Sequence, residues 1–170
     1  MATTVSGVLS PFYIRESPKS PLRVASPEEV KILVDSGYQV QAPVLEGGNF
    51  AFRSIESVSV ETIRMKTVKS FLTTSRTSLS LTSSLLVASE SFGVTETHPD
   101  GSIWIRASCL KDGLRLLVAC PPTGNRVFNL QPSPVSKAKQ EKPRNDVTTY
   151  TIRLNSSAAN LVLSTGVVFF

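Results

Sequence analysis

The sequence predicts an all-β domain: a single β-sandwich of the jelly-roll type, with one short helix near its N-terminus. Serine and threonine are abundant and occur together with valine, isoleucine and phenylalanine, a composition that favours pleated surfaces over helices. About seven or eight short stretches alternate between apolar and polar residues or run apolar, as the strands of a two-sheet sandwich do. The 170 residues, 41% of them hydrophobic and 18% charged, suffice for one core without disulfides or metals.

The first 25 residues are predicted to be an extended arm, and residues 26–170 the sandwich domain. The arm carries Pro11, Pro18 and Pro21, and proline removes a backbone donor and fixes φ. It lacks the basic stretch followed by a long apolar core that marks a targeting signal, and no window has the apolar length of a membrane span. We therefore expect no contact with a membrane.

The clearest local signal is a short helix between Ser26 and Gly37. Ser26 is a typical N-cap residue, Pro27 suits the first helical position, and Glu29 follows three residues after the cap. Gly37 is the kind of residue that ends a helix. The pattern predicts one helical segment in an otherwise β chain.

Alternation and apolar runs place the strands. Residues 50–60 are predicted to be a strand, whereas residues 61–72 fit strand and helix spacing equally and stay open. Residues 78–89 alternate and then become apolar, as a strand entering a core does. The remaining expectations are a short strand over 126–130, a long polar loop over 131–146 and two closing strands over 147–154 and 161–170.

Residues 103–109 and 114–120 are expected to pair as a hairpin. They alternate on either side of Asp112-Gly113, and Asp-Gly between alternating apolar runs favours a tight turn. In this register Cys109 faces a residue near Arg115, so no disulfide to Cys120 is expected. Trp104 lies on the face opposite the neighbouring isoleucines, either as an exposed contact or, as we favour, within a second packed face.

The net charge of +5 is unevenly distributed along the chain. The surplus of lysine and arginine lies in residues 50–80 and 136–170, and such clusters attract nucleic-acid phosphates. Aromatic residues do not interleave with them, which indicates backbone contacts without base stacking. The candidate RNA-binding residues are Arg64, Lys66, Lys69, Lys137, Lys139, Lys142 and Arg144. The alternative is a solvated surface without a partner.

Catalytic and metal chemistry find little support in the residue pattern. His98 is the only histidine, and it lies in a predicted turn, whereas Cys109 and Cys120 lie in apolar strand contexts typical of inert thiols. One histidine and two separated cysteines cannot supply a structural zinc site, and no glycine-rich phosphate loop is present. We expect no enzyme activity, no catalytic residue, no metal and no cofactor.

The two ends of the chain are candidates for contacts between subunits. The chain ends on Phe169 and Phe170, and an exposed apolar end favours aggregation, so we expect it to enter a core or an interface. Assembly contacts are assigned to Pro11, Phe12, Tyr13, Phe169 and Phe170.

Two stretches resemble the small jelly-roll coat proteins of icosahedral plant RNA viruses, in particular the tymovirus type. One is Ile55-Glu56-Ser57-Val58-Ser59; the other is Leu117-Val118-Ala119-Cys120-Pro121, followed by Asn125-Arg126-Val127. The resemblance implies a capsid subunit that self-assembles into a homo-oligomeric shell and contacts RNA phosphates through basic residues. It also implies a place in the virion, assembled in the host cytoplasm.

A second function class fits the same charge pattern. In it the chain is a non-assembling viral or host interaction protein, of the movement or defence-suppressor type, that binds RNA or a partner protein in the cytoplasm. A small discrete oligomer would favour this alternative, whereas shells carrying nucleic acid would favour the capsid subunit.

Overall fold

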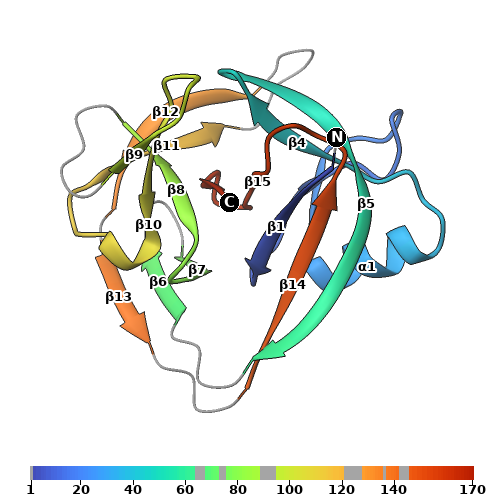
Figure 1. Ribbon diagram of the computed structural model, residues 1–170, viewed down its shortest axis with the longest axis horizontal. Helices are drawn as coiled ribbons and strands as arrows, with labels where there is room; N and C mark the ends of the chain where they lie inside the picture. The colour runs from blue at the N-terminus through green and yellow to red at the C-terminus, as the bar shows by residue number, and fades with distance from the viewer. Residues whose placement is uncertain are drawn as a thin grey trace.

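A computed structural model describes residues 2–63, 68–72, 76–88, 95–120, 128–135, 137–141 and 146–170 (Figure 1). The elements in chain order are β1 (Thr3–Val8), β2 (Phe12–Ile14), β3 (Arg23–Ala25), α1 (Pro27–Asp35), β4 (Gln41–Glu46), β5 (Asn49–Ile63), β6 (Val68–Leu72), β7 (Arg76–Ser80), β8 (Ser84–Val87), β9 (Thr95–Thr97), β10 (Ile103–Arg106), the 3-10 helix η1 (Ala107–Cys109), β11 (Arg115–Cys120), β12 (Asn129–Pro134), β13 (Lys137–Glu141), β14 (Val147–Leu154), β15 (Leu161–Val162) and β16 (Val168–Phe169). The expected mainly β class is confirmed.

Two larger sheets flank the C-terminal strands. One has the strand order β1-β14-β5-β4, and the other has the order β12-β11-β8-β10-β9, with β16 pairing both β8 and β15. Figure 1 shows these sheets on opposite sides of the molecule, with the C-terminus between them. Two small sheets, β13-β6-β7 and β2-β3, complete the pairings. The jelly-roll sandwich is not confirmed, because counting strands in a sequence does not determine which strands pair.

The predicted helix is confirmed at both ends. The Ser26 side chain accepts a hydrogen bond from the Glu29 backbone N–H at 3.2 Å, and Pro27 begins the helix. After the helix, Gly37 adopts φ +89°, which glycine tolerates without strain. Within the described ranges, no helix has the length and apolar character to cross a membrane.

The segment assigned to an arm forms paired strands in the structure. β1 pairs antiparallel with β14, and β2 pairs with β3. Val5, Val8, Phe12 and Ile14 are buried in the main hydrophobic cluster. The prolines that predict an extended chain are compatible with these strands, because none of the strands contains a proline.

The expected hairpin across Asp112-Gly113 is wrong. The turn itself forms, with Gly113 at φ +85°, but β10 and β11 do not pair with each other. β8 lies between them: Val87 is opposite Ile103 on one side and Leu116 on the other. The 3-10 helix η1 follows β10 directly and separates it from the Asp112-Gly113 turn. The strand therefore does not run into the turn, as a strand of a tight hairpin would. Alternation thus predicts the strands but not their neighbours.

Two other strand predictions are confirmed, since β5 covers residues 50–60 and β14 coincides with residues 147–154. The single strand expected over 161–170 is instead a hairpin of β15 and β16. The strand expected over 126–130 overlaps β12 at residues 129–130, and residues 126–127 lie outside the described ranges. The strand expected over 78–89 is divided by a turn into β7 and β8, which join different sheets. The polar loop expected over 131–146 instead contains most of β12 and all of β13, whose exposed polar side chains hide the strand pattern.

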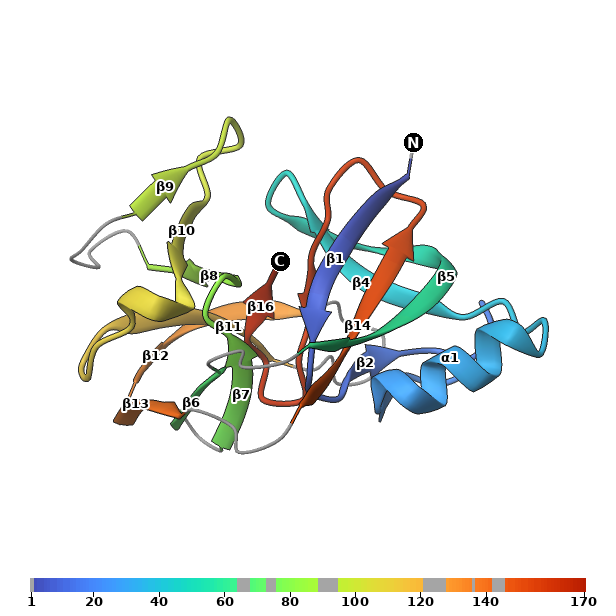
Figure 2. The same cartoon turned by 60° about the horizontal axis from the view of Figure 1, so that its bottom comes forward.

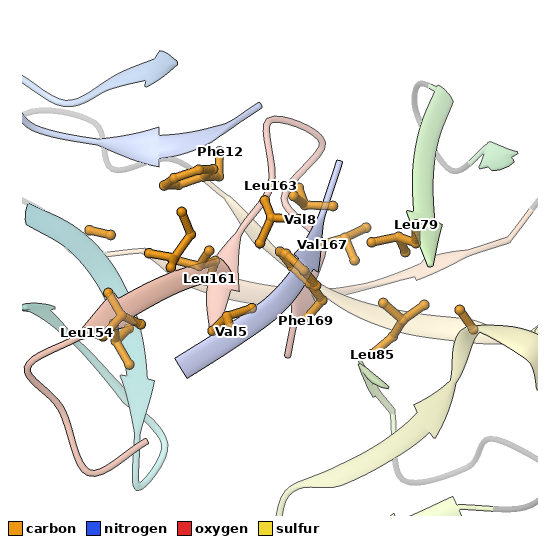
Figure 3. Close-up of a cluster of buried hydrophobic side chains, with 14 of the residues drawn as sticks. Val5, Val8, Phe12, Leu79, Leu85, Leu154, Leu161, Leu163, Val167 and Phe169 are labelled. Atoms are coloured by element: carbon orange, nitrogen blue, oxygen red, sulfur yellow. The ribbon is translucent and has the colours of Figure 1, made fainter. Parts of the chain in front are cut away.

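The C-terminal strands lie at the centre of the hydrophobic core. Phe169 is fully buried, and Figure 3 shows it among Val5, Val8, Leu85 and Leu161. β15 and β16 form a short hairpin, and the pairing of Phe169 with Leu85 attaches it to β8. The expectation that the apolar end enters a core is confirmed. This placement brings the last residue of the chain to the pocket described next.

Candidate active site

A pocket of about 570 Å³ lies at the C-terminal residue. In Figure 2 the C-terminus lies between the hairpin of β9 and β10 and the hairpin of β4 and β5. Both hairpins contribute to the wall, and the segment after β14 closes it. The lining residues are Leu45, His98, Pro99, Asp100, Trp104, Ser157, Ala158, Ala159, Asn160 and Phe170.

The backbone of Phe170 is held at the edge of β8. The Phe170 N–H donates to the Ser84 carbonyl oxygen at 3.0 Å, and the Phe170 carbonyl oxygen accepts from the Ser84 N–H at 2.9 Å. Successive side chains of a strand point to opposite faces, so Phe169 enters the core and Phe170 reaches the pocket. The carbonyl group of the last residue therefore has a fixed position and a fixed hydrogen-bond donor.

The Phe170 side chain packs with two other rings in this pocket. The His98 ring centroid lies 5.5 Å from the Trp104 ring and 5.4 Å from the Phe170 ring. Trp104 and Phe170 pack edge to face at 4.9 Å, an arrangement that aromatic pairs favour. The only imidazole of the chain thus contacts the residue whose carbonyl group is held by Ser84.

The turn that carries His98 is closed by its own hydrogen bonds. The His98 backbone N–H donates to the Ser102 carbonyl oxygen at 2.9 Å, and the Asp100 carboxylate accepts from the Ser102 N–H at 2.9 Å and from the Ser102 hydroxyl at 2.5 Å. The hydroxyl bond and then the backbone bond from Ser102 hold the pKa of Asp100 below its ordinary value of 3.8. The pocket therefore contains a carboxylate that is ionised at neutral pH.

The opposite wall is held by polar pairs, of which the one between Asn160 and Leu45 is buried. The Asn160 side-chain amide donates to the Leu45 carbonyl oxygen and accepts from the Leu45 N–H, both at 2.8 Å. The Glu46 carboxylate accepts from the Ser156 hydroxyl at 2.6 Å and from Arg53 Nη2 at 2.6 Å. These bonds tie the segment after β14 to the hairpin of β4 and β5, which fixes the width of the pocket.

Glu46 makes this wall sensitive to acid. The hydrogen bond from Arg53 chiefly, and then that from Ser156, lowers the pKa of Glu46 below its ordinary value of 4.5. A lowered folded-state pKa stabilises the fold above pH 4.5, and this stabilisation is lost as the pH falls through the folded-state value. We expect Glu46→Gln to lower the free energy of unfolding at neutral pH by about 1 kcal/mol, chiefly by weakening the Ser156 bond.

Urea unfolding, followed by Trp104 fluorescence at a series of pH values, measures this difference. The gap between wild type and Glu46→Gln should close in acid. Glu56→Gln is the matched control, because its partner Arg153, at 2.9 Å, is exposed and the pair lies away from the pocket. A gap of equal size at every pH would contradict the assigned role of Glu46.

The basic residues predicted to bind RNA are not gathered at this pocket as far as they are described. Lys137 and Lys139 are exposed on β13, which pairs with β6, the strand that carries Lys69. Arg64, Lys66, Lys142 and Arg144 lie outside the described residues. No group of three or more His, Cys, Asp or Glu side chains that could hold a metal occurs in the described part of the chain.

The residues assigned to assembly are divided between surface, core and pocket. Pro11 is exposed and Tyr13 is half-buried, whereas Phe12 and Phe169 are fully buried in the core. Phe170 lines the pocket. Neither buried phenylalanine is available to a second subunit, because each fills space in its own core.

Sequence reasoning missed most of the pocket. The sequence places His98 in a turn without a catalytic role, and Trp104 either as an exposed contact or, as favoured, in a packed face. Asp100, Ser157 and Asn160 were not identified at all. The signal that could have found part of the site is local: the only histidine precedes a Pro-Asp-Gly turn and a tryptophan follows it.

Solved structures with this fold are inteins. The chain is similar to an intein from a hyperthermophile, with a TM-score of 0.72 and 10% identity over 98% of this chain and 99% of that one. The transcription factor IIB Mvu mini-intein has a TM-score of 0.67 and 16% identity, over 99% of this chain and 98% of that one. A bacterial intein-like domain from Clostridium thermocellum has a TM-score of 0.59 and 14% identity, over 94% of this chain and 97% of that one. At these identities the likeness shows the fold. No protein-family model and no curated protein matches the chain.

These structures correct the functional expectations. The resemblance to viral coat proteins is wrong, since the structures that match from end to end are inteins, and neither the capsid function nor the movement or defence-suppressor alternative has support. The expected RNA-containing shell of identical subunits is wrong for the same reason. The expectation of no enzyme activity is also overturned, because inteins catalyse rearrangement of their own peptide bonds. Short strand-like strings recur in unrelated β folds, which explains the misleading resemblance.

Proposed function

We propose that this chain is a self-processing domain that acts on the peptide bond after Phe170 when further residues follow it in a longer polypeptide. The observation that carries the proposal is the position of Phe170. Its carbonyl oxygen accepts a hydrogen bond from Ser84, and its ring contacts the only imidazole of the chain. The intein fold, matched along nearly the whole length of both chains, supports the same reading.

The pocket holds the groups that acyl transfer needs. The Ser84 N–H donates to the Phe170 carbonyl oxygen and would stabilise the negative charge that develops there during attack. Ser157 contributes an exposed hydroxyl to the pocket wall. A hydroxyl becomes an effective nucleophile when an adjacent base removes its proton, and His98 is the base that lines the same pocket.

The reaction can be written with all atoms balanced. The Ser157 oxygen attacks the Phe170 carbonyl carbon while His98 takes the hydroxyl proton. The bond from this carbon to the following amide nitrogen breaks, and His98 gives the proton to the departing amine. Water then hydrolyses the ester, which restores the Ser157 hydroxyl and leaves Phe170 as a free carboxylate.

The start of the chain borders the same pocket wall. The Thr3 hydroxyl donates to the Ala158 carbonyl oxygen at 3.4 Å, and Ala158 lines the pocket beside Phe170. The segment after β14 therefore bonds to the first strand and lines the same pocket as Phe170. Proximity of this kind favours transfer of an acyl group between two chain ends, since the encounter no longer costs translational entropy.

A fusion with a reporter at each end tests the proposal. The full chain is placed between two small proteins of different mass and refolded, and samples are taken over time for gel electrophoresis. We expect release of the reporter after Phe170, or a product that joins both reporters. The same fusion held in denaturant is the control, since it lacks the pocket. A refolded fusion that stays intact across the pH range in which imidazole titrates would contradict the proposal.

A further inference from the structure

We infer that Trp104 is a positioning residue for the reaction: its indole ring holds the His98 imidazole against Phe170. The inference rests on the proposed function and adds a residue that touches both the proton carrier and the boundary residue. Trp104 and His98 belong to the same β9–β10 hairpin, whereas Phe170 comes from the far end of the chain. The packing of these three rings sets the place of the imidazole.

The His98 ring needs a neighbour to fix it. Its backbone is held, because the His98 N–H donates to Ser102 and its carbonyl oxygen accepts from Gly101, each at 2.9 Å. The side chain nevertheless extends from a turn and is 31% exposed, and the carboxylate that lies 3.7 Å from its Nε2 belongs to Glu96, which is itself 70% exposed. A side chain in such a place keeps rotamer freedom unless another group packs on it. The indole ring packs against the imidazole in a tilted arrangement, at an interplanar angle of 30°, and supplies this contact.

The indole ring is itself held on several sides. Trp104 is only 4% exposed and packs in the second core cluster with Leu86, Phe128 and Val168. Its Nε1–H donates to the Ser102 hydroxyl at 2.8 Å, and this hydroxyl donates to Asp100. The chain of hydrogen bonds connects the indole to the turn that carries His98. A ring fixed by both packing and a hydrogen bond provides a rigid support for the imidazole.

Proton magnetic resonance of the full chain tests the contact independently of any reaction. The chain has one histidine, so its imidazole Hε1 resonance is assigned without ambiguity. We expect this resonance upfield of a free imidazole, because it lies over neighbouring aromatic rings. Trp104→Leu should move it towards the free value, and Ser102→Ala, which keeps the ring but removes the Nε1–H acceptor, should move it part of the way.

Tyr38→Leu is the matched control, since Tyr38 is 53% exposed and follows α1. The control should leave the resonance unchanged. If Trp104→Leu fails to fold, Ser102→Ala decides, because it keeps the indole ring and removes only the hydroxyl that joins Trp104 to Asp100. A resonance that stays in place in the folded variants would overturn the inference.

The two-reporter fusion then separates this inference from the proposed function. If the wild-type fusion is processed, Trp104→Leu should slow processing about 10- to 100-fold, the loss expected from a misplaced catalytic group. Processing of that variant at the wild-type rate would overturn the inference and leave the proposed function in place. An intact wild-type fusion in which the His98 resonance still responds to Trp104 would instead defeat the proposed function.

Discussion

Replacement of Gly166 by alanine is expected to lower the free energy of unfolding by about 2 to 4 kcal/mol. Gly166 has φ +90°, and an added Cβ would lie 2.5 Å from the Ala119 carbonyl oxygen. The backbone cannot easily shift to relieve this clash, because two hydrogen bonds hold Gly166 in place. The Ala119 N–H donates to the Gly166 carbonyl oxygen at 2.7 Å, and the Gly166 N–H donates to the Leu163 carbonyl oxygen. The turn between β15 and β16 depends on this glycine, and these strands place Phe169 and Phe170.

Gly37→Ala is the matched control for this prediction. Gly37 has nearly the same φ, +89°, but an added Cβ would meet nothing within 4 Å. Its loss should reflect the left-handed backbone alone, about 1 kcal/mol. Urea unfolding, followed by the fluorescence of the only tryptophan, measures both variants. Equal losses in the two variants would show that the contact with Ala119 contributes nothing.

The second large effect is expected on the reaction. His98→Ala should slow release of the reporter after Phe170 by about 10² to 10⁴-fold, the usual contribution of a side chain that transfers a proton. The fold should persist, because the His98 side chain is partly exposed and its turn is closed by backbone bonds. Rate constants from a time course of product formation, measured beside the unfolding transition, separate the two effects.

Lys139→Gln provides the comparison for the His98 variant. Lys139 is exposed on β13 and forms no part of the pocket lining. The rate of reporter release should therefore match that of the wild-type fusion. If His98→Ala matches it too, the proton must move through another group and the mechanism proposed here is wrong.

Local signals in the sequence predict local structure well. The helix between Ser26 and Gly37 needs only a cap, a proline at its first position and a glycine after its end, all within reach of one another. Its observed N-cap bond from Glu29 to Ser26 is the one that the pattern predicts. An apolar chain end must be covered, which predicts a core or an interface for Phe169; the structure shows the core, although Phe169 was assigned to contacts between subunits.

Long-range pairing is what the sequence does not determine. Residues 103–120 show a hairpin pattern, yet Val87 of β8 lies opposite both Ile103 and Leu116. Two strands show the same alternation of apolar and polar residues whether they pair directly or with a third strand between them. The pattern therefore cannot distinguish the two arrangements. β13 was missed because its exposed charged residues resemble those of a loop.

The candidate site depends on the same long-range pairing. His98 and Trp104 are close in sequence, but their contact with Phe170 exists only because β16 pairs with β8. This pairing brings Phe170 to the turn that carries His98. The sequence predicts that turn correctly but does not mark it as part of a site. The contact between His98 and Phe170 joins residues far apart in the sequence, so it appears only in the fold.

The most direct test of the account is the intact mass of a fusion that continues beyond Phe170. The fusion is purified in denaturant, refolded, and measured by mass spectrometry as a time course. The account predicts a fragment that ends with the free carboxylate of Phe170, together with a released partner that begins at the next residue, and slower formation of both in His98→Ala. An unchanged mass, or cleavage at another bond, would contradict the claim that this chain processes its own C-terminal boundary.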